Sequence, residues 1–183
     1  MAKDMTAPAK LPEFDVTNLL GARFPVIIED AVEITECDDC GKEEFHIPKL
    51  KELSQAVAVI RASMSIKLNP VDVKHLRKSC DLRAKDLADL LSATPEHVSR
   101  IENGKKVMSE AHERILRLYT CLKFADATLR MGITAEDVVN IKPKAAFDVT
   151  KTPELRLQYL RVEHRCSDDQ VDWMPEDDTM SAA

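Results

Sequence analysis

Four residues near the middle of the chain have side chains suited to recognising the edges of base pairs: Pro95, Glu96, Ser99 and Arg100. The guanidinium of Arg100 is a planar fork that matches guanine O6 and N7, a contact that contributes about 1–3 kcal/mol of discrimination. The ionised carboxylate of Glu96 can only accept hydrogen bonds, so it suits the N4 donor of cytosine, although a favourable charge at a helix N-terminus explains it equally well. Ser99 is a more modest candidate, and Pro95 offers only apolar contact, for example with a thymine methyl group. These residue types predict direct readout of double-stranded DNA.

Basic and polar residues beside these four could hold the phosphate backbone. Lys105 and Lys106 follow them immediately and form, with Asn103, the natural phosphate clamp, the alternative being a solvated loop. For His97, contact with a phosphate and simple solvent exposure are equally good interpretations. With Thr94 as a further candidate, this stretch combines base-reading and phosphate-binding side chains.

The apolar spacing of residues 83–104 predicts two short helices that would position these side chains. The first carries a half-buried stripe at the helical period, formed by Leu87, Ala88, Leu90 and Leu91. Ser92 and Ala93 then make a turn. Thr94 is a good N-cap and Pro95 suits the first helical position, because its missing N–H is one that a helix start leaves unpaired.

The second of these helices therefore begins at Pro95. Its apolar residues Val98 and Ile101 face inward, which turns the polar residues between them toward solvent or a partner. Asn103-Gly104 closes the helix, since glycine tolerates positive φ.

Two motifs in register connect this segment to a known family. The stretches Leu87-Ala88-Asp89-Leu90-Leu91 and Val98-Ser99-Arg100-Ile101-Glu102-Asn103-Gly104 resemble the Cro-type, or XRE, helix-turn-helix repressors, over residues 69–124, about a third of the chain. The resemblance implies that the second helix lies in the major groove, with its N-terminal half on base edges and its end on phosphates.

The chain departs from this family at two places. The family opens the first helix with Ser-Gln, which caps it and touches a phosphate, whereas Arg83-Ala84 stands here. Its turn glycine is replaced by Ser92. The comparison implies that some backbone anchoring is lost or transferred to Arg83 and Lys85, which join the predicted phosphate-binding residues.

The rest of a five-helix bundle can be assembled around this pair. Asn69 is a plausible cap and Pro70 lies near the start of a helix with apolar Val73, Leu76 and Cys80. Ser109 can cap a further helix, after residue 104, whose predicted core stripe is Ala111, Ile115, Leu118, Tyr119 and Leu122. Thr134 opens a short helix with apolar Val138 and Val139, stopped before Pro143.

Charge is distributed unevenly along the chain. The protein carries a net charge of −6, which is unpromising for binding a polyanion. Residues 67–124, however, hold 12 Lys and Arg against 8 Asp and Glu, whereas residues 1–66 and 125–183 each hold 7 against 12. Positive charge is thus concentrated on the segment that the motifs select, and binding should weaken as salt rises.

The order of elements predicts an α+β fold that is mainly α, with several parts. We expect a disordered arm (1–12) and a small antiparallel β-rich domain with a covering helix (13–66), whose strands are 24–28, 31–35 and 44–47 and whose helix runs from 49 to 62. The helix either covers the sheet or links it to the bundle. A hinge (63–67), the DNA-binding bundle (67–142), a short extension (143–166) and an acidic disordered tail (167–183) follow.

The pair Cys37-x-x-Cys40 followed by Gly41 has the knuckle shape that holds zinc. With the sheet before the bundle, it weakly resembles MqsA-type antitoxins over residues 24–124. That family's pattern provides a second Cys pair upstream, which this chain lacks, leaving His46 as the nearby extra ligand. Three interpretations stay open: a site decayed to a turn, zinc shared by two chains, or a redox pair.

The C-terminal part is ambiguous from sequence. Leu155, Leu157 and Tyr159 alternate as in a strand, which we favour, although a helix also fits. In the tail, the stretch with Val171, Trp173 and Met174 is either part of a disordered segment or a docking peptide for another protein.

The histidines do not suggest catalysis. They are scattered along the chain, without a His-x-x-x-His pair: His46, His75, His97, His112 and His164. Only four glycines are present, and none forms a phosphate-cradling loop. We therefore expect that the protein is not an enzyme. Five unpaired-looking cysteines and no membrane-length apolar run predict a cytoplasmic protein without membrane contact.

The sequence as a whole predicts a sequence-specific regulator of transcription. We expect a homodimeric repressor on a palindromic operator, with two recognition helices about 34 Å apart. No cofactor is expected apart from the possible zinc. The alternative is an antitoxin or adaptor that binds a toxin or another protein and autoregulates its operon.

Overall fold

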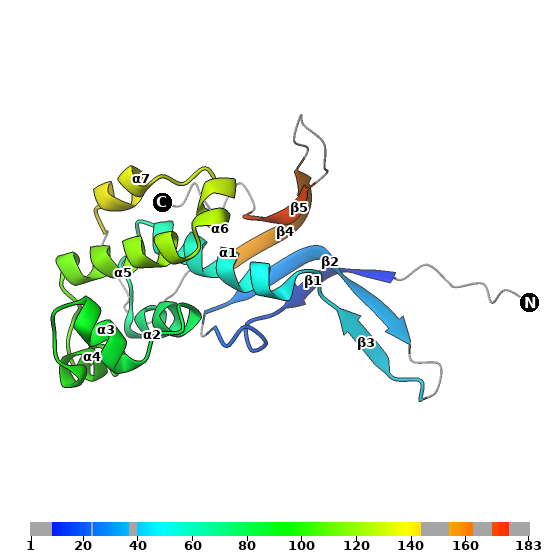
Figure 1. The fold of residues 1–183 in the computed structure, drawn as a ribbon. Helices are drawn as coiled ribbons and strands as arrows, with labels where there is room; N and C mark the ends of the chain where they lie inside the picture. Colours follow the sequence, from blue (N-terminus) through cyan, green and yellow to red (C-terminus); the bar gives the residue numbers. More distant parts are fainter. Residues whose placement is uncertain (1–8, 23, 37–39, 144–153, 163–169, 176–183) are drawn as a thin grey trace, which may run out of the picture.

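The computed structural model describes residues 9–22, 24–36, 40–143, 154–162 and 170–175. These residues form five strands and seven helices, an α+β fold that is mainly α. A sheet occupies one side of the molecule and a helical bundle the other, with α1 between them (Figure 1). Within the described residues, none of the helices has the length and apolarity needed to cross a bilayer.

The sheet combines strands from both ends of the chain. Its order is β1 (Ala9–Asp15), β2 (Val26–Glu36), β4 (Leu155–Val162) and β5 (Gln170–Pro175), while β3 (Glu43–His46) pairs with the outer half of β2. The β2–β4 pairing is parallel and the other pairings are antiparallel. The strand predicted at Leu155 is confirmed, but β4 and β5 complete the N-terminal sheet instead of forming an extension and a disordered tail.

Two further predictions for the sheet are wrong. The arm predicted as disordered ends by residue 9, because β1 begins at Ala9 and pairs with β2. Pro12 is accommodated because β1 is an outer edge and its register shifts between Leu11 and Glu13. The two strands predicted within residues 24–36 are one strand, β2. Asp30 lies between them with a left-handed φ of 50°, and β2 continues beyond it.

Helix α1 (Leu50–Ser63) belongs to two hydrophobic cores at once. Leu53, Val57 and Ile60 pack with the sheet, whereas Val59 and Ala62 pack with the bundle. Residues 56–62 are consequently buried without interruption, as expected for a helix covered on all sides. The helix both covers the sheet and links it to the bundle, so both of the roles considered from the sequence are correct.

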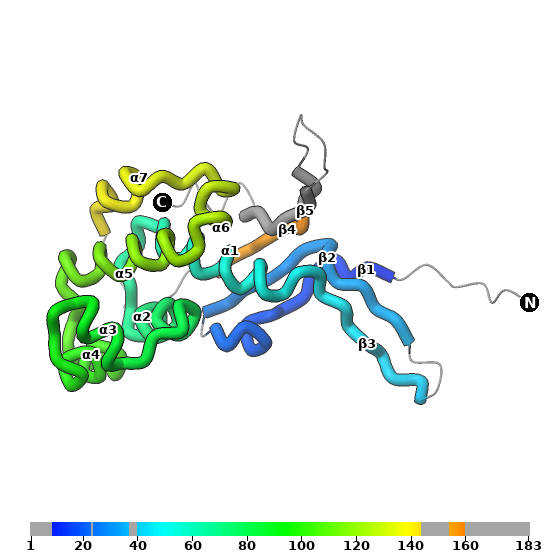
Figure 2. The backbone as a smooth tube through the Cα atoms, in the orientation of Figure 1, coloured from blue at the N-terminus to red at the C-terminus, as the bar shows by residue number. Residues whose placement is uncertain are grey.

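The bundle consists of α2 (Pro70–Ser79), α3 (Ala84–Leu90), α4 (Pro95–Glu102), α5 (Glu110–Lys123), α6 (Ala125–Arg130) and α7 (Ala135–Asn140), whose path Figure 2 traces. The predicted caps are confirmed, because each side chain accepts the N–H of the third helical residue: Asn69, Thr94, Ser109 and Thr134.

The apolar face predicted for α5 is wrong. The buried residues of this helix are Glu113, Leu116, Arg117, Thr120 and Cys121. The predicted core residues Ile115 and Leu122 are instead 37% and 69% exposed. Periodicity failed here because the inward face carries two charged residues, which hydropathy assigns to solvent.

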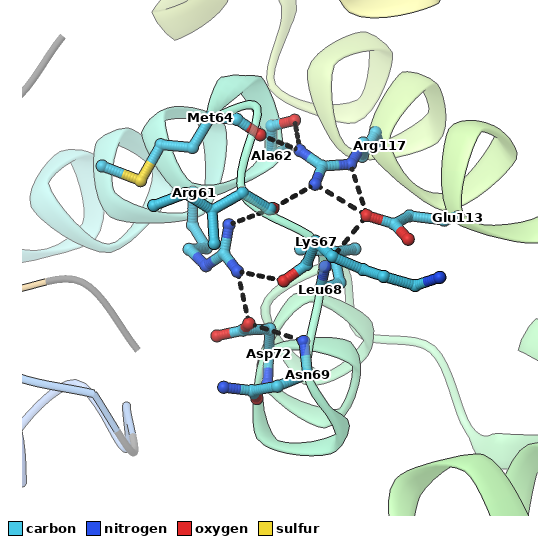
Figure 3. A network of polar contacts seen from close by, with 10 residues as sticks. Arg61, Ala62, Met64, Lys67, Leu68, Asn69, Asp72, Glu113 and Arg117 are labelled. Carbon is cyan, nitrogen blue, oxygen red and sulfur yellow. Dashed lines mark hydrogen bonds and ion pairs between the residues drawn. The ribbon is translucent and has the colours of Figure 1, made fainter. Parts of the chain in front are cut away.

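Those two charged residues belong to a buried network around the segment between α1 and α2 (Figure 3). The guanidinium of Arg117 donates to the carbonyl oxygens of Ala62, Met64 and Ile66, at 2.6, 2.5 and 2.7 Å. It also pairs with Glu113 at 2.8 Å, and the same Glu113 oxygen accepts the backbone N–H of Leu68 at 2.9 Å. Arg117 therefore holds the segment directly to α5.

A second ion pair fixes the same segment from the other side. The guanidinium of Arg61 donates to the carbonyls of Ile66 and Lys67 and pairs with Asp72, whose carboxylate also accepts the N–H of Asn69. The side chains of Arg61 and Asp72 are fully buried. The stretch predicted as a hinge, residues 63–67, is thus fixed by two arginines, because its carbonyls are the acceptors that these guanidiniums need.

The turn between α3 and α4 contains a backbone conformation that suits glycine better than serine. Ser92 has a φ of 51°, in the left-handed region. This is the position where the sequence resemblance expects glycine. An L-residue there pays about 1–2 kcal/mol for the contact between its Cβ and the backbone.

Replacing Arg117 tests the network. Arg117→Met leaves Glu113 charged and buried and removes the donors to three carbonyls, so we expect the free energy of unfolding to fall by about 3–5 kcal/mol in urea denaturation. Arg114→Met, at an exposed position on the same helix, should change it by less than about 0.5 kcal/mol. Equal stability of the two variants would contradict this account.

Replacing Ser92 tests the strained turn. We expect Ser92→Gly to raise the free energy of unfolding by about 0.5–1 kcal/mol, because relief of the left-handed strain exceeds the added entropy of the unfolded chain. Ser54→Gly, in the middle of α1, should lower it by about 0.5 kcal/mol. Thermal melts of both variants would show shifts of opposite sign, and a lower melting temperature for Ser92→Gly would refute the strain.

Candidate nucleic-acid interface

Helix α4 lies with α3 at the end of the molecule opposite the β2–β3 arm (Figure 1). Val98 and Ile101 are 1% and 2% exposed, so the apolar side of the helix is buried as predicted. Its other side faces outward, and Glu96, Ser99 and Arg100 are exposed there. The helix therefore presents a polar surface at one end of the molecule.

An ion pair that the sequence analysis missed fixes the direction of α4. Arg77 of α2 binds both carboxylate oxygens of Glu102, at 2.6 and 3.1 Å, and donates to the Leu82 carbonyl at 2.7 Å. Both side chains are largely buried. Glu102 lies inside the second sequence motif, so its place in that motif was the available signal. A two-pronged contact holds orientation as well as position.

The four predicted base-reading residues all lie on the exposed side of α4. Within the described residues, the guanidinium of Arg100 forms no ion pair, so its donors are available to a partner. The pKa of Glu96 is lowered by hydrogen bonds from its own N–H and from the Thr94 hydroxyl. Its carboxylate is thus turned toward the start of α4, which favours the helix-terminus interpretation over cytosine recognition. Pro95 is exposed at the first helical position.

The residues of the predicted phosphate clamp differ in whether their side chains are bound within the helix. Lys105 and Lys106 are exposed just beyond α4. Asn103 instead donates its side-chain amide to the carbonyl and hydroxyl of Ser99, at 2.8 and 3.3 Å. Asn103 and Ser99 therefore close the end of α4 together, and the two lysines carry the available charge.

The start of α3 explains the departure from the family's Ser-Gln. The Asp86 carboxylate accepts the backbone N–H of Arg83 at 2.8 Å, which satisfies the helix start without a serine. It also binds the Arg83 guanidinium through two bonds of 2.9 Å, and these contacts lower the pKa of Asp86 to about 2. Arg83 is consequently compensated, whereas Lys85 is exposed beside it.

His97 lies at the edge of this surface, beside two other basic side chains. Its Nδ1 is 3.3 Å from the Lys106 ammonium, and its ring stands edge-on to that of His112, with centroids 5.7 Å apart. Burial, followed by the charges of Lys106, His112 and Arg100, lowers the pKa of His97. His112, on α5, was not predicted, because its sequence distance from α4 hides the contact.

The predicted zinc ligand Cys37 lies outside the described residues. Cys40 is an exposed free thiol and His46 is exposed on β3. Across the described residues, no group of three or more His, Cys, Asp or Glu side chains could hold a metal ion. The three interpretations of the Cys pair therefore stay predictions.

The resulting surface consists of α4, the lysines that follow it and the start of α3. Among the described residues, Lys85, Arg100, Lys105 and Lys106 are exposed on it without an ion-pair partner, although Lys106 contacts His97. Its acidic residues Asp86 and Glu96 are engaged at helix starts. The arrangement can donate hydrogen bonds outward from a helix held by buried contacts. Comparisons of the chain with protein-family models, curated proteins and solved structures found no match.

Proposed function

We propose that this chain is a sequence-specific regulator of transcription that binds double-stranded DNA, a cytoplasmic homodimeric repressor reading a palindromic operator through α4. The observation that carries the proposal is the exposed side of α4, which presents Arg100 as an unpaired fork on a helix whose opposite side is buried. A helix of this kind fits the major groove, and a guanidinium is the group that reads guanine there.

The charges around α4 support the same proposal. Lys105, Lys106 and Lys85 are exposed at the two ends of the helix pair, where phosphates flank a helix in the groove. The acidic flanks of the chain lower its non-specific affinity for polyanions, which leaves this surface to select its target.

An exposed apolar face supports the dimer. Ala111, Ile115, Leu118 and Leu122 follow one another at intervals of four, three and four residues along α5; Leu118 is half-buried against the bundle core, and Leu122 is 69% exposed. This is the spacing with which two helices pack side by side. A second copy on this face would join two α4 helices in one symmetric molecule.

The same face is the specific observation that favours the alternative, an antitoxin or adaptor. Leu122 of this face is 69% exposed and Leu129, on the following helix α6, is 74% exposed, so a different protein could bind there instead. A toxin-like partner that co-purifies at a fixed ratio would support this alternative, whereas a two-chain mass for the protein alone supports the homodimer.

Two single variants test the DNA surface. In selection from random duplexes, Arg100→Ala should lose preference at one base position, at a cost of about 1–3 kcal/mol. Lys105→Ala should weaken all duplexes about equally and reduce the slope of log affinity against log salt by about 1. Lys51→Ala, exposed on α1, is the control and should bind as wild type does. Wild-type binding by both test variants would end the assignment of this surface.

The dimer has its own test. Leu122→Glu should shift the mass measured by light scattering from two chains to one, because a carboxylate would be buried in the apolar contact. Leu19→Glu, at a 55% exposed residue outside α5, should leave the mass unchanged. A wild-type protein with the mass of one chain at micromolar concentration, or a dimeric Leu122→Glu variant, would disprove this interface.

A further inference from the structure

A cluster of three basic side chains lies on the flank of α4. His97 comes from α4, Lys106 from the loop that follows it and His112 from the first turn of α5. The Lys106 Nζ–His97 Nδ1 distance is 3.3 Å, and the two imidazole centroids are 5.7 Å apart. Three separate elements thus bring their cationic or protonatable groups to one place.

As a hydrogen bond, the Lys106–His97 contact is compatible with only one protonation state of His97. An ammonium can only donate, so Nδ1 of His97 must accept and be unprotonated. A proton on this nitrogen would remove the acceptor and set two cations against each other. The contact is therefore possible only while His97 is neutral.

The surroundings of His97 act in the same direction. Burial lowers the pKa of His97 most, and the charges of Lys106 on the loop, His112 on α5 and Arg100 on α4 lower it further. The neighbouring carboxylates are engaged elsewhere: Glu96 faces the start of its own helix, and Glu113, next to His112, is paired with Arg117.

His112 also has an unused nitrogen. Its Nδ1 is buried and has no hydrogen-bond partner among the described residues. Its backbone N–H is bound by the Ser109 hydroxyl at 3.2 Å, which places the ring at the beginning of α5. The positive end of this helix dipole, like the side chains, favours an anion.

From this arrangement we infer that His97, Lys106 and His112 together bind one phosphate of the DNA backbone, and that this contact couples DNA affinity to pH through protonation of His97. The inference rests on the proposed function and goes beyond it, since it adds His112 to the interface and gives the site a regulator. A phosphate can accept from Lys106 and from protonated His97 at once, so it replaces the repulsion between them with two charge-assisted hydrogen bonds.

The direction of the pH effect follows from linkage. His97 has a pKa below 6.5 in the free protein, and a neighbouring phosphate raises it in the complex. Between these two pKa values, binding takes up a proton, so affinity rises as pH falls through this interval. The effect levels off below the free-protein pKa, where His97 is protonated in both states.

The experiment measures the affinity of the full chain for a mixed-sequence duplex of about 30 base pairs by fluorescence anisotropy, at constant ionic strength, from pH 5.5 to 7.5. We expect the dissociation constant to fall as the pH is lowered, by up to about tenfold for a difference of one unit between the free and bound pKa of His97. Calorimetry in buffers of different ionisation enthalpy should show proton uptake.

Variants separate this site from general effects of acid. His97→Gln should remove most of the pH dependence, and His112→Gln should reduce it, whereas His46→Gln, at an exposed histidine on β3, should retain it. A wild-type protein whose duplex affinity does not change with pH, or a His97→Gln variant with the wild-type slope, would overturn the inference while leaving DNA binding intact. No salt-dependent duplex binding at either pH would instead refute the proposed function itself.

Discussion

The fold depends on four buried charges around the connection between α1 and α2. Arg61, Asp72, Glu113 and Arg117 neutralise one another and, at the same time, the two arginines satisfy the carbonyls of a half-buried, non-helical segment. Such a network adds little net stability, because desolvation offsets most of the attraction. The network instead determines the backbone conformation of this segment, because the donors of each guanidinium have fixed directions and the segment's carbonyls must meet them.

A short series of buried contacts connects this network to the candidate interface and fixes the position of α4. The network fixes the start of α2 through Asn69 and Asp72, and α2 fixes α4 through the ion pair between Arg77 and Glu102. Helix α1, shared by both cores, holds the sheet against the same bundle. A surface that reads base edges must be held to within a fraction of an ångström, and a buried scaffold of this kind provides that precision.

Local sequence patterns predicted the α3–α4 helix pair well, but contacts between segments far apart in the chain could not be predicted from them. Thr94, Pro95 and the Val98–Ile101 spacing located α4 because capping and periodicity act within a few residues. No comparable signal marks the inward face of α5, where Arg117 is buried because carbonyls from another segment accept from it, and Glu113 because it pairs with Arg117 and the Leu68 N–H. The pairing of β4 with β2 joins residues far apart in the chain, so no local pattern could show it.

The distribution of acids within the bundle explains how an acidic protein can present a basic surface. Three carboxylates near α4 are each engaged by an N–H or a guanidinium: Asp86 at the start of α3, Glu96 at the start of α4 and Glu102 against Arg77. The lowered pKa of Asp86, about 2, shows that its negative charge is held by these donors. Among the described residues, the lysines beyond α4 have no carboxylate partner, and Lys106 contacts the ring of His97. The positive charge of this surface therefore acts locally, and salt should screen it at a distance of about 10 Å while the buried ion pairs persist.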